Sequence, residues 1–282
     1  MISGLSEIAD EYDAILCDVW GVIHNGVVAN RETSEALQAF RASGKPVILI
    51  TNAPRPNPPI QAQLARLGVP REAFDLIITS GDVTRTLLAR AEARRVLHVG
   101  PERDLPLFDG LDLERVGDAQ AELVVCTGLF DDETETPDDY RERFAALVEA
   151  GLELICANPD IVVDRGNTLI WCAGALARLY DELGGKTTIV GKPYAPVYVL
   201  AREQMTDLLG RPAETARLLA IGDGLPTDIR GAVGAGIDAL FVTAGIHAED
   251  FGPADAPDPE RIAARLAEEG LTVRAAMPRL KW

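Results

Sequence analysis

The sequence predicts an α/β protein with a parallel sheet covered by helices, organised in about two domains. Short apolar, β-branched runs alternate with longer segments of helical period, which is the pattern of successive βαβ units. The chain has 282 residues, about twice the length of an average domain. With 47% hydrophobic and 25% charged residues, its composition is that of a globular protein rather than a disordered one.

The expected strands are short, and longer helical segments lie between them. The strands are expected at Ala14–Asp18, Pro46–Thr51, Asp75–Thr79, Arg95–Val99, Glu122–Thr127, Glu153–Ala157, Thr187–Val190, Arg217–Asp223 and Asp238–Thr243. The helices are expected at Glu32–Ala42, Pro58–Leu67, Val83–Ala93, Pro137–Ala150, Ala173–Leu183, Pro196–Leu209 and Pro259–Glu268.

Charge and composition argue against several classes of protein. The 27 Lys and Arg against 44 Asp and Glu give a formal net charge of −17, whereas nucleic-acid binding needs concentrated positive charge. No apolar run approaches the roughly 18 residues of a membrane span, and the acidic start does not resemble a signal peptide. The four cysteines lie far apart without a CxxC pair, which argues against a disulfide framework or a zinc site. We therefore expect a soluble, cytoplasmic protein without nucleic-acid or membrane partners.

Polar residues follow three of the expected strands, in the runs AILCD, VILIT and LLAIGD. Because the carboxyl ends of parallel strands line the ligand crevice of such a sheet, Asp18, Thr51 and Asp223 are expected to converge there. One strand that ends at a polar residue is ordinary, but three such ends together indicate a site.

The acids at these strand ends suggest two kinds of chemistry. Asp18, in CDVWGVIHNG, lies where a carboxylate can act as a covalent nucleophile, although a helix cap would look similar. Asp223 and Asp228, in IGDGLPTDIRG, flank a turn that opens a helix through Pro226. Together with Asp18 they would offer Mg²⁺ the hard oxygen ligands it prefers, and the alternative is a turn followed by a capped helix.

Two further motifs favour phosphate binding. Lys192, in IVGKPYAPVY, lies in an apolar context after a short strand, where its charge would neutralise phosphoryl oxygens; the alternative is a solvated loop lysine. Thr51 and Asn52, in LITNAPR, offer a hydroxyl and backbone N–H groups to an anion, although ordinary turns select the same residues.

The order of these motifs, D…T…K…GDxxxxD, resembles the haloacid dehalogenase-like (HAD) superfamily. The likeness is greatest to its capped subclass IIA, which contains p-nitrophenylphosphatase-like hydrolases. The long insertion between the Thr51 and Lys192 motifs, the NPD tripeptide Asn158–Asp160 and the GKP tripeptide Gly191–Pro193 carry that closer resemblance. It covers essentially the whole chain.

The resemblance implies a Mg²⁺-dependent phosphohydrolase that acts on a small phosphorylated metabolite. Asp18 would be the nucleophile that forms an aspartyl-phosphate, Thr51 would hydrogen-bond the phosphoryl group, and Lys192 would stabilise both. Asp223 would be the main carboxylate ligand of Mg²⁺, supported by Asp228. Asp18 and the backbone carbonyl of Trp20 would complete the metal site.

Trp20 is also the position at which the sequence departs from the family pattern. Phosphatases of this superfamily generally read DxD, where the second aspartate is the general acid and base, but this chain reads Asp18-Val19-Trp20. General acid–base catalysis contributes typically 10²–10⁴-fold, so alkyl phosphates should suffer most and aryl or acyl phosphates least. His24 is a candidate replacement, and an ordinary polar loop residue is its alternative.

Two alternative functions remain open. An aromatic residue at this position also occurs in hydrolytic haloacid dehalogenases, which need no metal, whereas the acidic pair here looks retained for one. A catalytically weak protein that binds a phosphorylated ligand is the third hypothesis.

The resemblance further implies a Rossmann-like core over residues 1–86 and 191–282, with an inserted α/β (C2-type) cap over residues 87–190. The cap would carry a substrate-specificity loop at Asp160, Val163, Asp164, Arg165 and Asn167. There Arg165 would pair with a second anionic group of the substrate or, alternatively, with a neighbour such as Asp164. Substrate contacts are thus expected from Thr51, Asn52, Asn158, Asp160, Arg165 and Lys192. The acidic run Asp131–Glu135 is interpreted as the approach to a helix N-terminus. A homodimer would be unsurprising in this subclass, and Trp282 either folds back or serves a dimer contact.

Overall fold

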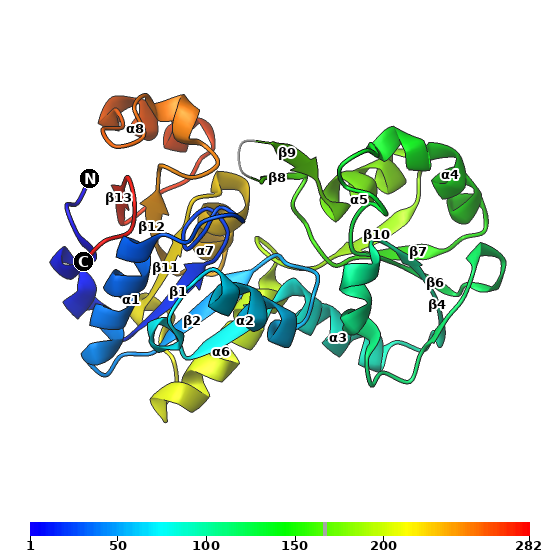
Figure 1. Ribbon diagram of the computed structural model, residues 1–282, viewed down its shortest axis with the longest axis horizontal. Helices are drawn as coiled ribbons and strands as arrows, with labels where there is room; N and C mark the ends of the chain where they lie inside the picture. The colour runs from blue at the N-terminus through cyan, green and yellow to red at the C-terminus, as the bar shows by residue number, and fades with distance from the viewer. Residues whose placement is uncertain (166–167) are drawn as a thin grey trace. The chain divides into compact units, whose positions relative to one another are not determined.

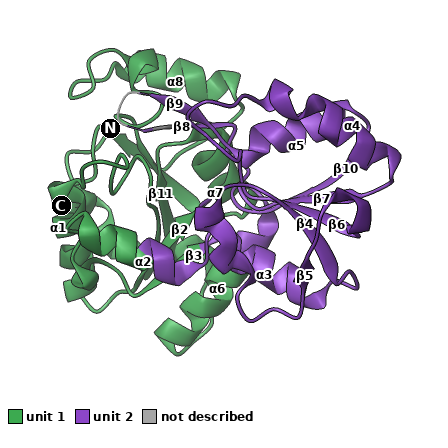
Figure 2. Ribbon diagram, turned by 45° about the vertical axis from the view of Figure 1, so that its right-hand side comes forward, with its two compact units in different colours: residues 1–51, 61–78, 198–282 green, residues 52–60, 79–197 purple. Residues whose placement is uncertain are grey.

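The computed structural model describes residues 1–165 and 168–282, and the chain forms two compact units (Figure 1; Figure 2). Unit 1 comprises Met1–Thr51, Gln61–Ile78 and Tyr198–Trp282, and unit 2 comprises Asn52–Ile60 and Thr79–Val197. The bounds of these compact units differ from the core of residues 1–86 and 191–282 and the cap of residues 87–190 expected from the sequence. The division into a catalytic core and a cap stays a prediction.

Unit 1 is built on a six-stranded sheet with the order β13-β12-β11-β1-β2-β3. Its strands are β1 (Ala14–Asp18), β2 (Val47–Thr51), β3 (Leu76–Thr79), β11 (Leu218–Gly222), β12 (Asp238–Val242) and β13 (Ala275–Met277). The pairs from β13 through β2 are parallel, and every residue of β1, β2 and β11 is buried. Continuous apolar strands of this kind are expected where helices cover both faces of a parallel sheet.

The α-helices are α1 (Arg31–Ala42), α2 (Asn57–Arg66), α3 (Ser80–Arg90), α4 (Arg141–Glu149), α5 (Ala173–Glu182), α6 (Ala195–Leu209), α7 (Arg230–Gly234) and α8 (Pro259–Glu268). The side chains of Asn30, Thr79 and Asp258 cap the N-termini of α1, α3 and α8. Before α3, the Asp82 N–H donates to Thr79 Oγ1 at 2.9 Å and the Thr79 N–H donates to Asp82 Oδ2 at 3.1 Å. This reciprocal pair is a capping box, and it starts the helix three residues before the predicted Val83.

Unit 2 has its own parallel sheet, with the order β10-β7-β6-β4-β5. Its strands are β4 (Arg95–Val99), β5 (Glu114–Arg115), β6 (Leu123–Cys126), β7 (Glu153–Cys156) and β10 (Lys186–Ile189). Phe144 of α4 and Tyr180 of α5 pack edge to face in its core, with ring centroids 5.3 Å apart. An antiparallel hairpin, β8 (Val162–Asp164) and β9 (Leu169–Trp171), lies outside this sheet. The predicted α/β class with a parallel-sheet core is confirmed.

The structure also bears on the cysteines, the C-terminal tail and the membrane-span expectation. The four cysteines are free and buried, so the predicted absence of a disulfide holds for them. The C-terminal tail folds back, because the Leu5 N–H donates to the Lys281 carbonyl at 2.8 Å, while the Trp282 side chain stays exposed. Within the described ranges, no helix combines the length and apolar character of a membrane span.

Candidate functional site

The sheet register brings the predicted strand-end residues of unit 1 to one edge. Asp18 ends β1 opposite Ile50, so Thr51, the last residue of β2, lies one step further along the neighbouring strand. On the other side of β1, Cys17 lies opposite Ile221, and Asp223 directly follows the end of β11. The carboxyl ends of these parallel strands therefore meet as the sequence predicts.

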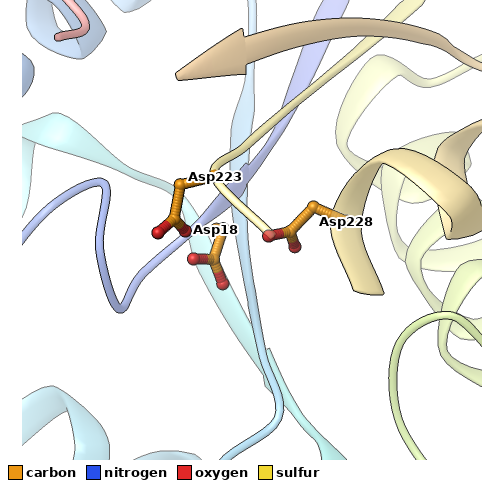
Figure 3. A group of neighbouring side chains, drawn as sticks. All are labelled: Asp18, Asp223 and Asp228. Carbon is orange, nitrogen blue, oxygen red and sulfur yellow. The ribbon is translucent and has the colours of Figure 1, made fainter. Parts of the chain in front are cut away.

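Three carboxylates cluster at this edge (Figure 3). Asp18, Asp223 and Asp228 are all buried, and each offers an oxygen within 4.8 Å of the others. Buried like charges at this separation repel strongly unless a cation or a proton compensates them. Three carboxylate oxygens are also the hard ligands that a divalent cation such as Mg²⁺ prefers. The residues present therefore fit a divalent metal ion.

Backbone groups hold two of these acids in place. The Ile246 N–H donates to Asp223 Oδ2 at 2.8 Å, and the Gly224 N–H donates to Asp228 Oδ2 at 2.9 Å. Asp228 lies in the helical turn Leu225–Ile229, which begins through Pro226 as expected. These two bonds orient both carboxylates at the edge of the sheet.

Two glycines have no side chain at the place where the Asp223 carboxylate lies, and any larger residue there would collide with it. A Cβ atom at Gly245 would lie 2.0 Å from Asp223 Oδ2, and one at Gly21 would lie 2.2 Å from the same oxygen. Gly21 also has φ +88°, a conformation that side chains other than glycine rarely adopt. Gly21 lies within the motif CDVWGVIHNG, whereas no motif in the sequence marks Gly245.

Trp20 and His24 form a small packed unit beside the nucleophile candidate. Their rings meet edge to face with centroids 5.1 Å apart, and the Gly26 N–H donates to His24 Nδ1 at 2.9 Å. Burial lowers the pKa of His24 to about 4, so the imidazole is neutral at pH 7 with Nδ1 already engaged. A neutral imidazole is a very weak acid, which argues against His24 as the replacement for the missing aspartate.

The buried histidines predict an acid-sensitive stability. Burial lowers the pKa values of His24 and His98 to about 4, whereas an unfolded histidine titrates near 6.5. Between these values the unfolded chain binds more protons, so stability should fall as pH drops from 6.5 to 4, by up to about 3 kcal/mol per histidine. Denaturant unfolding of wild type and His24→Gln at pH 7.5 and 4.5 measures this. Equal pH dependence in the two proteins would contradict it.

In unit 2, four of the predicted substrate-contacting residues form one hydrogen-bonded group. Asn52 Oδ1 accepts from the Lys192 N–H at 2.8 Å, and Asn52 Nδ2 donates to the Lys192 carbonyl at 3.2 Å and to Asp160 Oδ1 at 2.8 Å. Asn158 Oδ1 in turn accepts from the Asp160 N–H at 3.0 Å. Lys192 is only 4% exposed, so the solvated-lysine alternative is wrong. Asn52 therefore ties the backbone of Lys192 to the loop that follows β7.

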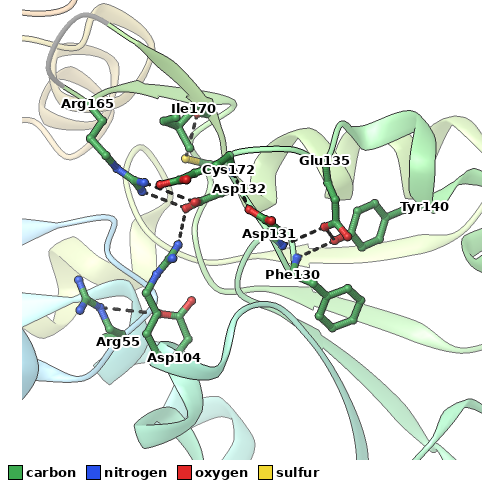
Figure 4. Close-up of polar contacts among 12 residues, drawn as sticks. Arg55, Asp104, Phe130, Asp131, Asp132, Glu135, Tyr140, Arg165, Ile170 and Cys172 are labelled. Atoms are coloured by element: carbon green, nitrogen blue, oxygen red, sulfur yellow. Dashed lines mark hydrogen bonds and ion pairs between the residues drawn. The ribbon is translucent and has the colours of Figure 1, made fainter.

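Arg165 pairs with Asp132, through Nη2 and Oδ2 at 2.9 Å (Figure 4). The alternative partner named from the sequence was the neighbour Asp164. Asn167, the last residue of the expected specificity loop, lies outside the described residues. Asp132 belongs to the acidic run that the sequence analysis assigned only to a helix N-terminus, and nothing in the local pattern indicated an arginine partner.

Two family models and a solved structure match this chain over long stretches. The family model "haloacid dehalogenase-like hydrolase" matches residues 15–114, and a second model, "HAD-hydrolase-like", matches residues 189–269. A crystal structure of a hydrolase of the haloacid dehalogenase-like family from Brucella suis 1330 is 47% identical with a TM-score of 0.89, covering 99% of this chain and 100% of its own.

Two relatives with named activities are more distant. The ribonucleotide monophosphatase NagD of Escherichia coli K12 is 26% identical over 84% of this chain and 89% of its own length. The glycerol phosphate phosphatase of Mycobacterium tuberculosis, crystallised in complex with calcium, is 26% identical with a TM-score of 0.65, covering 85% of this chain and 68% of its own.

Proposed function

Because the chain belongs to the haloacid dehalogenase-like hydrolase family, we propose that it is a Mg²⁺-dependent phosphatase of small phosphorylated metabolites. The observation that carries the proposal is the buried cluster of Asp18, Asp223 and Asp228 at the carboxyl edge of a parallel sheet. The named relatives support it, since NagD and the mycobacterial protein are both phosphatases.

The proposed reaction proceeds through a covalent phosphoryl-enzyme. A carboxylate oxygen of Asp18 attacks phosphorus in line, the bond to the leaving oxygen breaks, and an aspartyl-phosphate forms. Water then attacks that phosphorus, which releases inorganic phosphate and regenerates the carboxylate. Thr51 donates its hydroxyl hydrogen to the phosphoryl group, and the Lys192 ammonium offsets its negative charge.

The acidic cluster would hold the metal ion in this scheme. Asp18, Asp223, Asp228 and the Trp20 carbonyl would be its ligands, and the bound ion would offset the charge between carboxylates and phosphate. With Trp20 in place of an acid, and His24 neutral, the leaving group must depart without a strong proton donor. Good leaving groups such as aryl and acyl phosphates are therefore the substrates expected to react fastest.

Phosphate release from an aryl and an acyl phosphate, with Mg²⁺ or with a chelator, tests the function. We expect release with Mg²⁺ only, and a loss of at least about 100-fold in Asp223→Asn, which removes one charged ligand of the cluster. Halide release that persists with chelator would instead support the dehalogenase alternative. Mg²⁺-dependent thermal stabilisation by a phosphate ester without turnover would support the binding protein.

Asn52 should act as a positioning residue for Lys192. Asn52→Ala removes the hydrogen bonds to both backbone groups of Lys192 and to Asp160, and kcat should fall about 10- to 100-fold. Asn52→Asp keeps the acceptor for the Lys192 N–H but sets a carboxylate against Asp160, so it should also be impaired.

A double variant that exchanges the donor at residue 52 and the acceptor at residue 160 distinguishes a positioning role of Asn52 from a general loss of structure. In the double variant Asn52→Asp/Asp160→Asn, the new amide at 160 can donate to the new carboxylate at 52. Steady-state kinetics should show a kcat above that of Asn52→Asp but below that of wild type, because the carboxylate at 52 has no N–H for the Lys192 carbonyl. A double variant no better than either single variant would contradict the positioning role.

Two predictions about context accompany the function. We propose that the chain forms a homodimer, and light scattering of the purified protein should then give twice the mass of one chain. We also propose that it is cytoplasmic, so fractionation of cells that produce it should recover it in the cytoplasmic fraction.

A further inference from the structure

The loop that follows β12 holds the Asp223 carboxylate in unit 1. The Ile246 N–H donates to Asp223 Oδ2 at 2.8 Å, and Gly245 leaves room for the same oxygen. A backbone N–H that donates to a carboxylate fixes the direction of its oxygens, and metal ligands depend on partners of this kind for their orientation. The position of residues 245 and 246 therefore decides how Asp223 enters the acidic cluster (Figure 3).

The sheet fixes the first half of this loop. The Thr243 N–H donates to the Met277 carbonyl at 3.0 Å, and the Ala244 N–H donates to the Pro278 carbonyl at 2.9 Å. These bonds continue the parallel pairing of β12 with β13 beyond the end of β12. The backbone up to residue 244 is therefore held by the neighbouring strand.

The second half of the loop turns into the short helix Ala248–Phe251. The Ala248 N–H donates to the Gly245 carbonyl, and the Asp250 N–H donates to the His247 carbonyl, both at 3.0 Å. These two bonds close local turns and do not reach another element of unit 1. Side chains of the turn must therefore anchor it to the rest of the unit.

The His247 side chain connects this turn to helix α8. It is 18% exposed, and its Nδ1 atom lies 3.5 Å from Asp250 Oδ2. The same carboxylate oxygen lies 3.8 Å from Arg265 Nη1 on α8. Among the described residues, His247 Nε2 and Arg265 Nε are buried and have no hydrogen-bond partner. The contact through Nδ1 is therefore the polar contact that orients the imidazole ring.

The imidazole acts in this contact as a neutral donor. Burial lowers the pKa of His247, and the charge of Asp250 offsets only part of this shift. The ring is therefore neutral at pH 7, and with its hydrogen on Nδ1 it donates toward the Asp250 carboxylate. A side-chain amide that carries an N–H at the same place could replace it.

Ion pairs continue from α8 to the helix that follows Asp228. Arg265 Nη2 lies 3.2 Å from Glu269 Oε1, and Glu269 Oε2 lies 2.8 Å from Arg230 Nη2. Arg230 begins α7, two residues after Asp228. These charged side chains thus link the loop that holds Asp223 to the helix that follows Asp228.

We propose that His247 and Arg265, joined through Asp250, are positioning residues for Asp223. They fix the turn after β12, so that the Ile246 N–H orients the Asp223 carboxylate for a metal ion. This inference rests on the metal site of the proposed function, and its three residues lie outside the motifs found in the sequence.

Calorimetric titration with MgCl₂ tests the proposal, because it measures the dissociation constant of the metal without turnover. His247→Ala removes the contact with Asp250, and Arg265→Ala separates Asp250 from α8. Each variant should raise the dissociation constant about 10-fold, the effect typical of residues that orient a metal ligand. His247→Asn places an amide N–H near the position of Nδ1, and it should bind Mg²⁺ within about 3-fold of wild type.

Arg261→Ala is the matched control for Arg265→Ala. Arg261 lies on the same helix and pairs with Asp258 at 3.7 Å instead of with Asp250. This variant should leave the dissociation constant of Mg²⁺ unchanged. Partly exposed ion pairs contribute little to stability, so both arginine variants should keep a melting temperature close to that of wild type without metal.

A dissociation constant that neither alanine variant changes would overturn the positioning role, and so would a loss in His247→Ala that His247→Asn does not restore. Binding of Mg²⁺ by wild type that Asp223→Asn does not weaken would contradict the metal site itself, and the inference with it. Metal affinities as expected, without Mg²⁺-dependent p-nitrophenyl phosphate hydrolysis above the Asp18→Asn background, would contradict only the phosphatase function and would support the positioning role.

Discussion

Replacement of Asp18 by asparagine is expected to lower Mg²⁺-dependent phosphate release by on the order of 10³-fold or more. The amide keeps the size of the side chain, but it cannot act as the carboxylate nucleophile. In the absence of metal, Asp18→Asn should be at least as stable as wild type, since it removes one of three mutually repelling carboxylates. Its stabilisation by Mg²⁺ should be smaller, because one charged ligand is lost.

A phosphate-release assay and a thermal melting curve of Asp18→Asn together distinguish a catalytic role of Asp18 from a structural one. Asp10→Asn is a suitable control, because Asp10 is fully exposed and pairs loosely with Lys45 at 3.7 Å. It should retain the activity of wild type. Phosphate release by Asp18→Asn at the wild-type rate would show that Asp18 is not the nucleophile. A large drop in its stability without metal would indicate a mainly structural role for Asp18.

Replacement of Trp20 by aspartate is expected to raise hydrolysis of an alkyl phosphate such as glycerol 3-phosphate by about 10²–10⁴-fold. The new carboxyl group would lie two residues after Asp18 and would donate the proton that an alkoxide leaving group needs. Hydrolysis of p-nitrophenyl phosphate should change much less, since its leaving group departs without protonation. Measurement of kcat/KM for both esters gives the ratio directly.

Trp20→Asn controls for the loss of the indole ring. Both variants lose the edge-to-face contact with His24 and the packing over Gly26, so both should lose similar stability. Only the aspartate can transfer a proton. Equal rates in the two variants, or a wild type that already hydrolyses alkyl and aryl phosphates at similar rates, would show that another group supplies the acid.

Long elements of the fold followed from sequence pattern, and short ones did not. β1 (Ala14–Asp18), β4 (Arg95–Val99) and α8 (Pro259–Glu268) have the bounds expected from the sequence. The two- and three-residue strands β5, β8, β9 and β13 were missed. Strands of this length contain too few residues for a period of two to be visible, and their pairing partners decide whether they form.

The position of the acidic cluster was predictable from the strand ends, because the register of β1 and β11 brings Asp18 and Asp223 to one edge of the sheet. Residues whose role depends on contacts with remote segments of the chain lie in no recognisable sequence motif. Gly245 matters because Asp223 occupies the place of its missing side chain, and Asp132 because two distant arginines converge on it. Such contacts depend on packing between remote segments, which local sequence does not encode.

The family resemblance stated from the motifs is confirmed, and so is the enzyme class, a hydrolase of the phosphatase type. Membership of subclass IIA is supported by the match to NagD. The individual roles of Asp18, Thr51, Lys192 and the metal ligands stay predictions, because each depends on a reaction rather than on a position.

The most direct test of the account is to trap the phosphoryl-enzyme. Protein mixed with Mg²⁺ and an acyl phosphate is quenched in acid within the first turnover, digested, and analysed by mass spectrometry. We predict a mass increase of one HPO₃ unit on the peptide that contains Asp18, lost on treatment with hydroxylamine and absent from Asp18→Asn. Phosphorylation of a different residue, or rapid turnover with no labelled peptide, would contradict covalent catalysis by Asp18.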